Sequence, residues 1–140
     1  MPNWFVHMDW AQKARIPKKI AEFVNRSIDY GSDWVNNTIS GRSNIDESPF
    51  YHQLVYFYDK DHDHRNYVKA YYLHHLLDFF KETNVDVRRL DLVFETFLQK
   101  KAVVEIRNPH GQRVKFNKLL EDIFQLLREN KTQLLEDLFG

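Results

Sequence analysis

The sequence predicts an all-α protein, folded as a compact bundle of five to seven helices in a mixed, orthogonal arrangement. Apolar residues recur three and four positions apart along most of the 140-residue chain, which is the spacing of one face of an α-helix. Only 4 glycines and 4 prolines are present, and this scarcity disfavours a turn-rich β-sandwich. β-branched residues on both sides of the turn at 108–111 indicate one small hairpin near residues 102–116, with an interrupted helix as the alternative.

The N-terminal half is expected to contain three helices. Two lie between residues 9 and 30. Asp9 is a natural N-cap for the first, and Pro17 suits the first turn of the second because its φ is fixed at a helical value. Residues 32–47 lose the helical period and are rich in Asn and Ser, which predicts a loop. A third helix, over about residues 48–58, begins with a Ser-Pro pair.

The helix expected over about residues 65–82 is apolar nearly all round, so it should be central and buried. Its residues Leu73, Leu76 and Leu77 should be nearly inaccessible to solvent. The Asp-His repeat just before it, at positions 61–64, is interpreted as a solvated connection, with weak metal binding as the alternative.

The C-terminal part is expected to contain one helix after a cap at Asn84 or Asp86, and then an amphipathic tail over residues 118–139. Asn130 should divide the tail into two helices. The leucine-rich face of this tail suits packing within the chain, and it also suits a homodimer.

Composition excludes several classes of protein. The 20 basic and 20 acidic residues cancel, so the chain has no overall positive charge to attract nucleic acid. Cysteine is absent, which excludes disulfides, thiolate metal sites and a cysteine nucleophile. No membrane span and no secretory signal are evident, so a cytoplasmic location is the default. The length of the chain suits a single domain over residues 1–140. Phosphate-binding glycine loops and serine-hydrolase motifs are also missing.

The candidate chemistry lies in the histidines, five of which fall between His52 and His75. His74 and Asp78 are four residues apart and leave the same face of a helix, and His75 is three residues from Asp78. Their surroundings are apolar, so Asp78 needs a cation, a hydrogen-bond donor or a proton. The pair suits a divalent metal, but a purely structural His–Asp hydrogen bond explains it equally well.

His7 favours the metal interpretation. It lies in an aromatic segment at the start of the chain, from which it could pack against the central helix. His52, beside Tyr51 and Tyr56, is a further inward-facing candidate ligand, whereas His110 belongs to a turn and is expected to be exposed.

Two short motifs support a family resemblance. The opening Met-Pro-Asn-Trp-Phe-Val-His, followed by an amphipathic helix, and the H-x3-D helix at residues 70–78 resemble the shorter prokaryotic members of the zinc-dependent phospholipase C family, which is related to the S1/P1-type nucleases. The resemblance covers roughly the first 80 residues. It implies an all-helical scaffold and zinc ligands at His7, His74 and Asp78, and Asp46 loosely resembles the ligand that the family takes from a loop.

The chain also departs from that family. After Asp78 it has only His110, where family members carry a further histidine and an H-x3-E pair, and Trp4 is internal where secreted members use an N-terminal Trp. A three-metal site therefore cannot be assembled, but a site for one or two metals can. The HD-type phosphohydrolases are a weaker comparison, because the only adjacent His-Asp pair, His62-Asp63, falls in the polar connection.

Two classes of function follow. The first is a metal-dependent hydrolase acting on a phosphoester, or a degenerate relative of one. Its divalent metal, with zinc the first choice, would be held by His7, His74 and Asp78, and His52 or Asp46 would complete the shell. His75 would act as the general base, and Tyr71 or Tyr72 would orient Asp78. The second class is a non-catalytic helical interaction protein with a buried His/Asp polar network.

Overall fold

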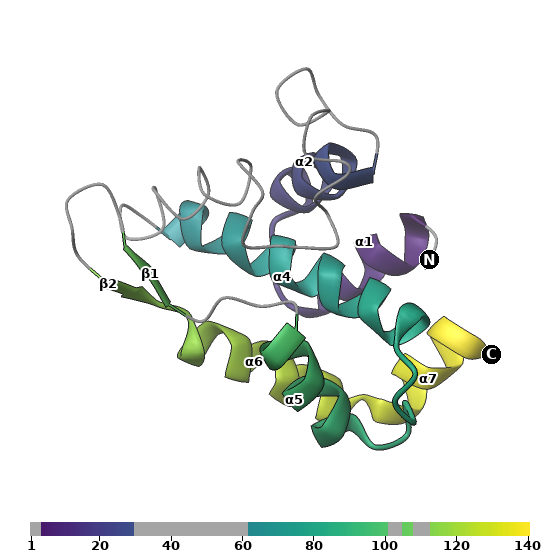
Figure 1. The fold of residues 1–140 in the computed structure, drawn as a ribbon. Coiled ribbons are helices and arrows are strands. Elements are labelled where there is room, and N and C mark those ends of the chain that lie inside the picture. The colour runs from purple at the N-terminus through teal and green to yellow at the C-terminus, as the bar shows by residue number, and fades with distance from the viewer. Residues whose placement is uncertain (1–3, 30–61, 101–104, 108–112) are drawn as a thin grey trace.

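The fold is an all-α bundle, as predicted. The computed structural model describes residues 4–29, 62–100, 105–107 and 113–140, and these ranges contain six helices and one two-stranded hairpin (Figure 1). The elements are α1 (Trp4–Lys13), α2 (Lys18–Asp29), α4 (His62–Glu82), α5 (Leu90–Lys100), β1 (Glu105–Arg107), β2 (Arg113–Lys115), α6 (Asn117–Glu129) and α7 (Lys131–Phe139). The predicted loop at 32–47 and helix at 48–58 lie outside the described residues.

Helix α4 runs through the middle of the molecule and contacts every other helix (Figure 1). Helices α1 and α2 pack together on one side of it, α5 and α6 lie on the other side, and α7 lies beside its C-terminal end. This central position follows from the sequence, because Leu73, Leu76 and Leu77 are 2%, 0% and 0% exposed. The prediction that this helix forms the centre of the core is confirmed.

Helix α4 begins at His62, three residues earlier than expected, so the interpretation of residues 62–64 as a connection is wrong. These residues form the first turn of the helix. Polar residues at a helix end interrupt the apolar periodicity from which the sequence predicts the start of the helix. They do not interrupt the helix, because the first turn needs no buried face.

Helix α1 also begins earlier than expected, at Trp4, so Asp9 lies inside the helix and is not its N-cap. The physical reason is a stripe of buried side chains at helical spacing. His7, Trp10, Ala11 and Ala14 are all buried, and together they hold this helix against the core. His7 therefore projects from a regular helix and not from an extended lead-in segment.

The turn between α1 and α2 closes the first helix with a left-handed residue. Arg15 has φ 61°, its N–H donates to the carbonyl of Gln12 at 2.9 Å, and the N–H of Ile16 donates to Ala11 at 3.0 Å. This pair of bonds is a Schellman motif. Helix α2 starts at Lys18, directly after Pro17, whose carbonyl accepts the N–H of Ala21 at 3.0 Å, so the predicted start at Pro17 is right to within one residue.

Helix α5 starts at Leu90, later than a cap at Asn84 or Asp86 would place it. The carboxylate of Asp86 instead accepts the backbone N–H of Arg88 at 3.1 Å, which makes a turn that competes with the helix. Val87 consequently precedes the helix.

The C-terminal tail forms two helices that meet at Asn130, as predicted. Their apolar side chains are buried in the core of the same chain; they are Leu119, Leu120, Ile123, Phe124, Leu127, Leu134 and Leu138. The indole N–H of Trp10 donates to Asp137 at 3.0 Å, which joins α7 to α1. The face that suggested a homodimer is thus already covered, and the homodimer stays a prediction.

The predicted hairpin is present, with β1 and β2 antiparallel and Ile106 opposite Val114. Within the described ranges, no helix is long and apolar enough to span a membrane, in agreement with the sequence.

Candidate metal centre

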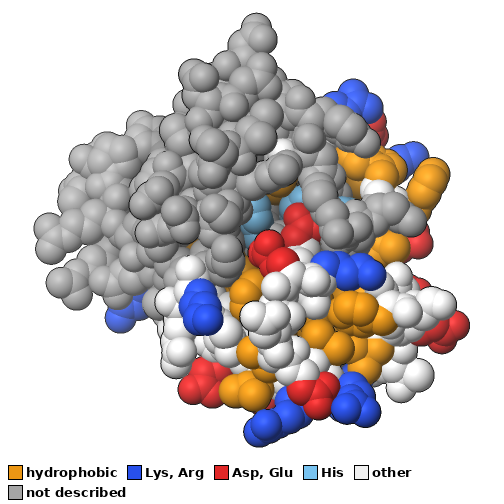
Figure 2. Space-filling view, turned by 45° about the vertical axis from the view of Figure 1, so that its right-hand side comes forward, with side chains coloured by type: hydrophobic (Ala, Val, Ile, Leu, Met, Phe, Trp, Pro, Cys, Tyr) orange, Lys and Arg blue, Asp and Glu red, His pale blue; other side chains and the backbone are white. Residues whose placement is uncertain are grey.

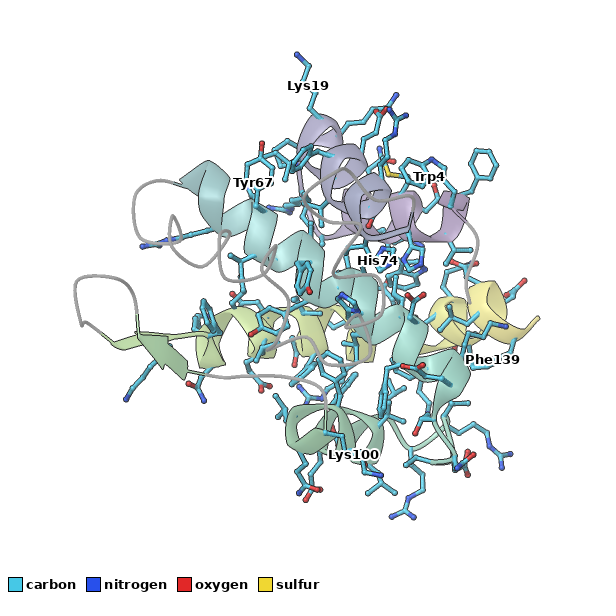
Figure 3. The ribbon with its side chains drawn as sticks, turned by 45° about the horizontal axis from the view of Figure 1, so that its top comes forward. Trp4, Lys19, Tyr67, His74, Lys100 and Phe139 are labelled. Carbon is cyan, nitrogen blue, oxygen red and sulfur yellow. The ribbon has the colours of Figure 1, made fainter. Side chains whose placement is uncertain are left out.

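Three helices bring four polar side chains together where α1, α2 and α4 meet. His7 comes from α1, Asn25 from α2, and His74 and Asp78 from successive turns of α4. His7 and His74 are each 1% exposed, and the side chain of Asp78 is 19% exposed. His74 points from α4 toward α1 and α2 (Figure 3). The juxtaposition of His7 with the H-x3-D pair, which the sequence suggested, is present.

Both histidines direct their Nε2 atoms at the same carboxylate. His7 Nε2 lies 3.1 Å from one oxygen of Asp78, and His74 Nε2 lies 3.2 Å from the other. The two imidazole rings stack nearly parallel, with centroids 3.8 Å apart and an interplanar angle of 7°. The three candidate ligand atoms all lie within 4.8 Å of one another.

Asn25 decides which nitrogen of His74 carries the hydrogen. Its side-chain oxygen lies 2.8 Å from His74 Nδ1, and its side-chain amide donates to Met8 Sδ at 3.4 Å. Because an amide oxygen can only accept, His74 Nδ1 must donate the hydrogen. In the neutral ring, Nε2 then presents a lone pair toward Asp78.

Asn25 was missed by the sequence reasoning, although a signal was available. It lies four residues after Ala21 and three before Ile28, both of which are buried, and is itself 2% exposed. An amide on the apolar stripe of a helix needs a buried partner. The pattern therefore indicated a polar contact at this position, but it did not indicate which residue would make it.

The charge on Asp78 is strongly favoured in this environment. Burial alone would raise its pKa, but hydrogen bonds and charge interactions with His7 and His74, in which a protonated imidazole faces the carboxylate, outweigh burial and hold the pKa well below its usual range. Asp78 is therefore ionised at neutral pH. The centre carries a fixed negative charge that a cation or a proton on one of the histidines must balance.

The three donors fit a divalent metal ion. With ligand distances of roughly 2.0–2.2 Å, tetrahedral geometry separates neighbouring ligand atoms by about 3.3–3.6 Å. The two N···O separations of 3.1 and 3.2 Å are slightly shorter, and one ring must also turn out of the parallel stack, because two parallel ring planes cannot both contain one ion. Two imidazoles and one carboxylate are a donor set for zinc, and also for iron. The hydrogen bond from His74 to Asn25 is the kind of outer contact that orients a metal-bound histidine.

The other predicted site residues lie at the edge of this centre or outside the described residues. His75 is 7% exposed; its ring is 5.7 Å from that of His74 and 4.6 Å from that of Tyr71, measured between centroids. Tyr72 packs against Phe116. The orienting role predicted for the two tyrosines stays a prediction. Asp46, His52 and His110 lie outside the described residues.

The centre is close to the surface. Asp78 is partly exposed, and histidine atoms are visible beside acidic side chains near the middle of the space-filling view (Figure 2). Comparisons of the chain with protein-family models, curated proteins and solved structures give no match.

Proposed function

We propose that the protein is a metal-dependent hydrolase that acts on a phosphoester, with one zinc ion held by His7, His74 and Asp78. One observation carries the proposal: two buried imidazoles, one of them with its tautomer set by Asn25, converge on the two oxygens of a single ionised carboxylate. A turn of one ring out of the nearly parallel stack brings the three side chains to a common point, and a divalent cation there would satisfy all three of them.

A cation explains the geometry better than protonation of both rings does. Two imidazolium ions stacked at 3.8 Å would repel one another in a buried site, so at most one ring carries an extra proton without a large cost. A single metal ion avoids this repulsion because both rings bind it in their neutral form.

The chemistry follows from the number of protein ligands. Three ligands leave a coordination position open, and a divalent metal there would lower the pKa of a bound water to near neutrality and polarise a phosphoryl oxygen. Asp78 and the two histidines hold the ion, while Asn25 keeps His74 in the tautomer that leaves Nε2 available. We assign the role of general base to His75 because of its place next to His74. The phosphoester substrate is inferred from the family resemblance.

The second candidate is the non-catalytic helical interaction protein. It is favoured by the hydrogen bond of 3.1 Å between His7 and Asp78, which closes a polar network joining α1, α2 and α4 without any ion. In that case a proton shared between the histidines balances Asp78, and the network serves to align the three helices.

Elemental analysis of the purified protein separates the two candidates. The wild type should carry about one zinc per chain, Asp78→Asn should carry none, and Asp9→Asn, at an exposed position of α1, should retain the metal. His75→Gln should keep the metal but slow hydrolysis of bis(p-nitrophenyl) phosphate by about 100-fold or more. A metal-free wild type that is fully folded and inactive would instead support the interaction protein.

A further inference from the structure

A second polar site lies away from the metal centre, where the first turn of α5 meets the end of α6 and the start of α7. Four basic side chains line a hollow of about 480 Å³ there: Arg88, Arg89, Arg128 and Lys131. We propose that this hollow binds the phosphate group of a small phosphorylated molecule. It shares no residue with the candidate metal centre, so the inference does not depend on the proposed function.

The local charge is the first reason. The chain as a whole has no net charge, yet the ionisable residues lining the hollow are four basic side chains and one acid, Asp91. Arg88 pairs with Asp86, and Arg128 pairs with Asp91 and Glu121. Among the described residues, Arg89 and Lys131 have no acidic partner within ion-pair distance. Arg128 has two acidic partners, so the four basic side chains and these three acids leave a net charge of about +1, and Arg89 and Lys131 are the cations available to an anion.

The second reason is the fixed position of Arg128. Its guanidinium donates to Asp91 at 2.9 Å and to Glu121 at 2.8 Å, and it lies over the ring of buried Phe94 at 5.3 Å from the centroid. The guanidinium is therefore held in place at the wall of the hollow before a ligand arrives, which lowers the entropy lost on binding. The first turn of α5 adds a smaller contribution, because the N-terminal end of a helix favours negative charge.

The composition of the hollow indicates the class of ligand. Guanidinium groups form paired hydrogen bonds with the oxygens of phosphate, and Arg89 and Lys131, which have no acidic partner in the described part of the chain, are the two cations that could face it. The volume of about 480 Å³ falls within the range of small-molecule sites and exceeds the space that an inorganic ion needs.

The test is a titration of the full chain with inorganic phosphate, monitored through the amide NMR signals of the residues that line the hollow. Saturable changes in chemical shift are expected at residues 89–92 and 131. The apparent affinity for phosphate should fall as salt is added. Arg89→Gln combined with Lys131→Gln should weaken phosphate binding by about tenfold. Lys19→Gln combined with Lys100→Gln changes the net charge equally at exposed positions elsewhere, so it should leave binding unchanged (Figure 3).

Several outcomes would overturn the inference. Chemical-shift changes that do not saturate would show only a general response to charge. Equal loss of phosphate affinity in both double variants would show the same. A stronger response to phosphatidylcholine vesicles containing phosphatidic acid than to free phosphate would assign the patch to a lipid surface. Asp78→Asn should leave the phosphate titration unchanged, so failure of the metal proposal and failure of this one are distinguishable.

Discussion

The imidazole rings of His7 and His74 stack at 3.8 Å between centroids, although one ring belongs to the first helix and the other to the central one. The stack exists because α1 is held against α4 by the buried Trp10 and its neighbours. Neutral rings tolerate this contact, whereas two charged rings would repel. The stack therefore favours at most one added proton on the pair of rings, or a metal ion bound to both.

The first prediction concerns Asn25, which accepts the hydrogen of His74 Nδ1. Asn25→Leu removes this acceptor, so the zinc affinity of the protein should fall by about 10- to 100-fold, as for other residues that orient a metal-bound histidine. Asn25→Asp keeps an oxygen in place and should retain most of the affinity. Competition with a zinc-sensitive dye measures the dissociation constants.

Asn117→Leu is the control for that experiment, because Asn117 is exposed at the start of α6. It should leave zinc affinity unchanged. Equal affinities for the wild type and Asn25→Leu, with both proteins folded, would show that Asn25 does not position His74 for metal binding.

The second prediction concerns the acid stability of the metal-free protein. The pKa of Asp78 in the folded state lies below its unfolded value of about 3.9. Its ionised form therefore stabilises the fold above about pH 4, and this contribution is lost as the pH falls toward the folded pKa.

Chemical denaturation between pH 5 and pH 2 measures this effect. The difference in the free energy of unfolding between the wild type and Asp78→Asn should be on the order of 2 kcal/mol near pH 5 and should shrink steadily below pH 4. A difference that stays constant over this range would contradict the ionised, histidine-paired state of Asp78.

The third prediction tests the position of α4 in the core. Leu77 is fully buried, so Leu77→Ala should lower the free energy of unfolding by about 2–5 kcal/mol. Leu126→Ala, at a partly buried position of α6, should cost clearly less. A loss below about 1 kcal/mol for Leu77→Ala would show that the helix is not central.

Much of the fold follows from the spacing of apolar residues, and the errors lie at the helix ends. The buried run from Tyr71 to Leu77 identified the central helix, and the polarity of Asn130 identified the division of the tail. The starts of α1, α4 and α5 differ from those that the sequence predicts. For α5 the reason is the hydrogen bond between Asp86 and Arg88. Such local bonds compete with a helix within a single turn and leave little trace in a periodic pattern.

The candidate centre was predictable only in part, because helix geometry relates residues within one helix but not residues on different helices. The H-x3-D spacing places His74 and Asp78 on one face by helix geometry alone, and the proximity of His7 was inferred from its aromatic surroundings. Asn25 was not assigned, because its contact with His74 depends on how α2 crosses α4. Packing angles between helices are tendencies set by many side chains, so one sequence does not determine which residues meet.

The last prediction concerns Arg15, whose φ of 61° places it in the left-handed region at the end of α1. A side chain in this conformation is strained, whereas glycine adopts it freely. Arg15→Gly should therefore raise the free energy of unfolding by about 0.5–1 kcal/mol, although the unfolded chain also gains freedom. Lys13→Gly, two residues earlier but inside the helix, should lower it by about 0.5–1 kcal/mol. Thermal unfolding of the two variants measures both changes in stability. If Arg15→Gly destabilised the protein as much as Lys13→Gly does, α1 would not end in a left-handed turn at this residue.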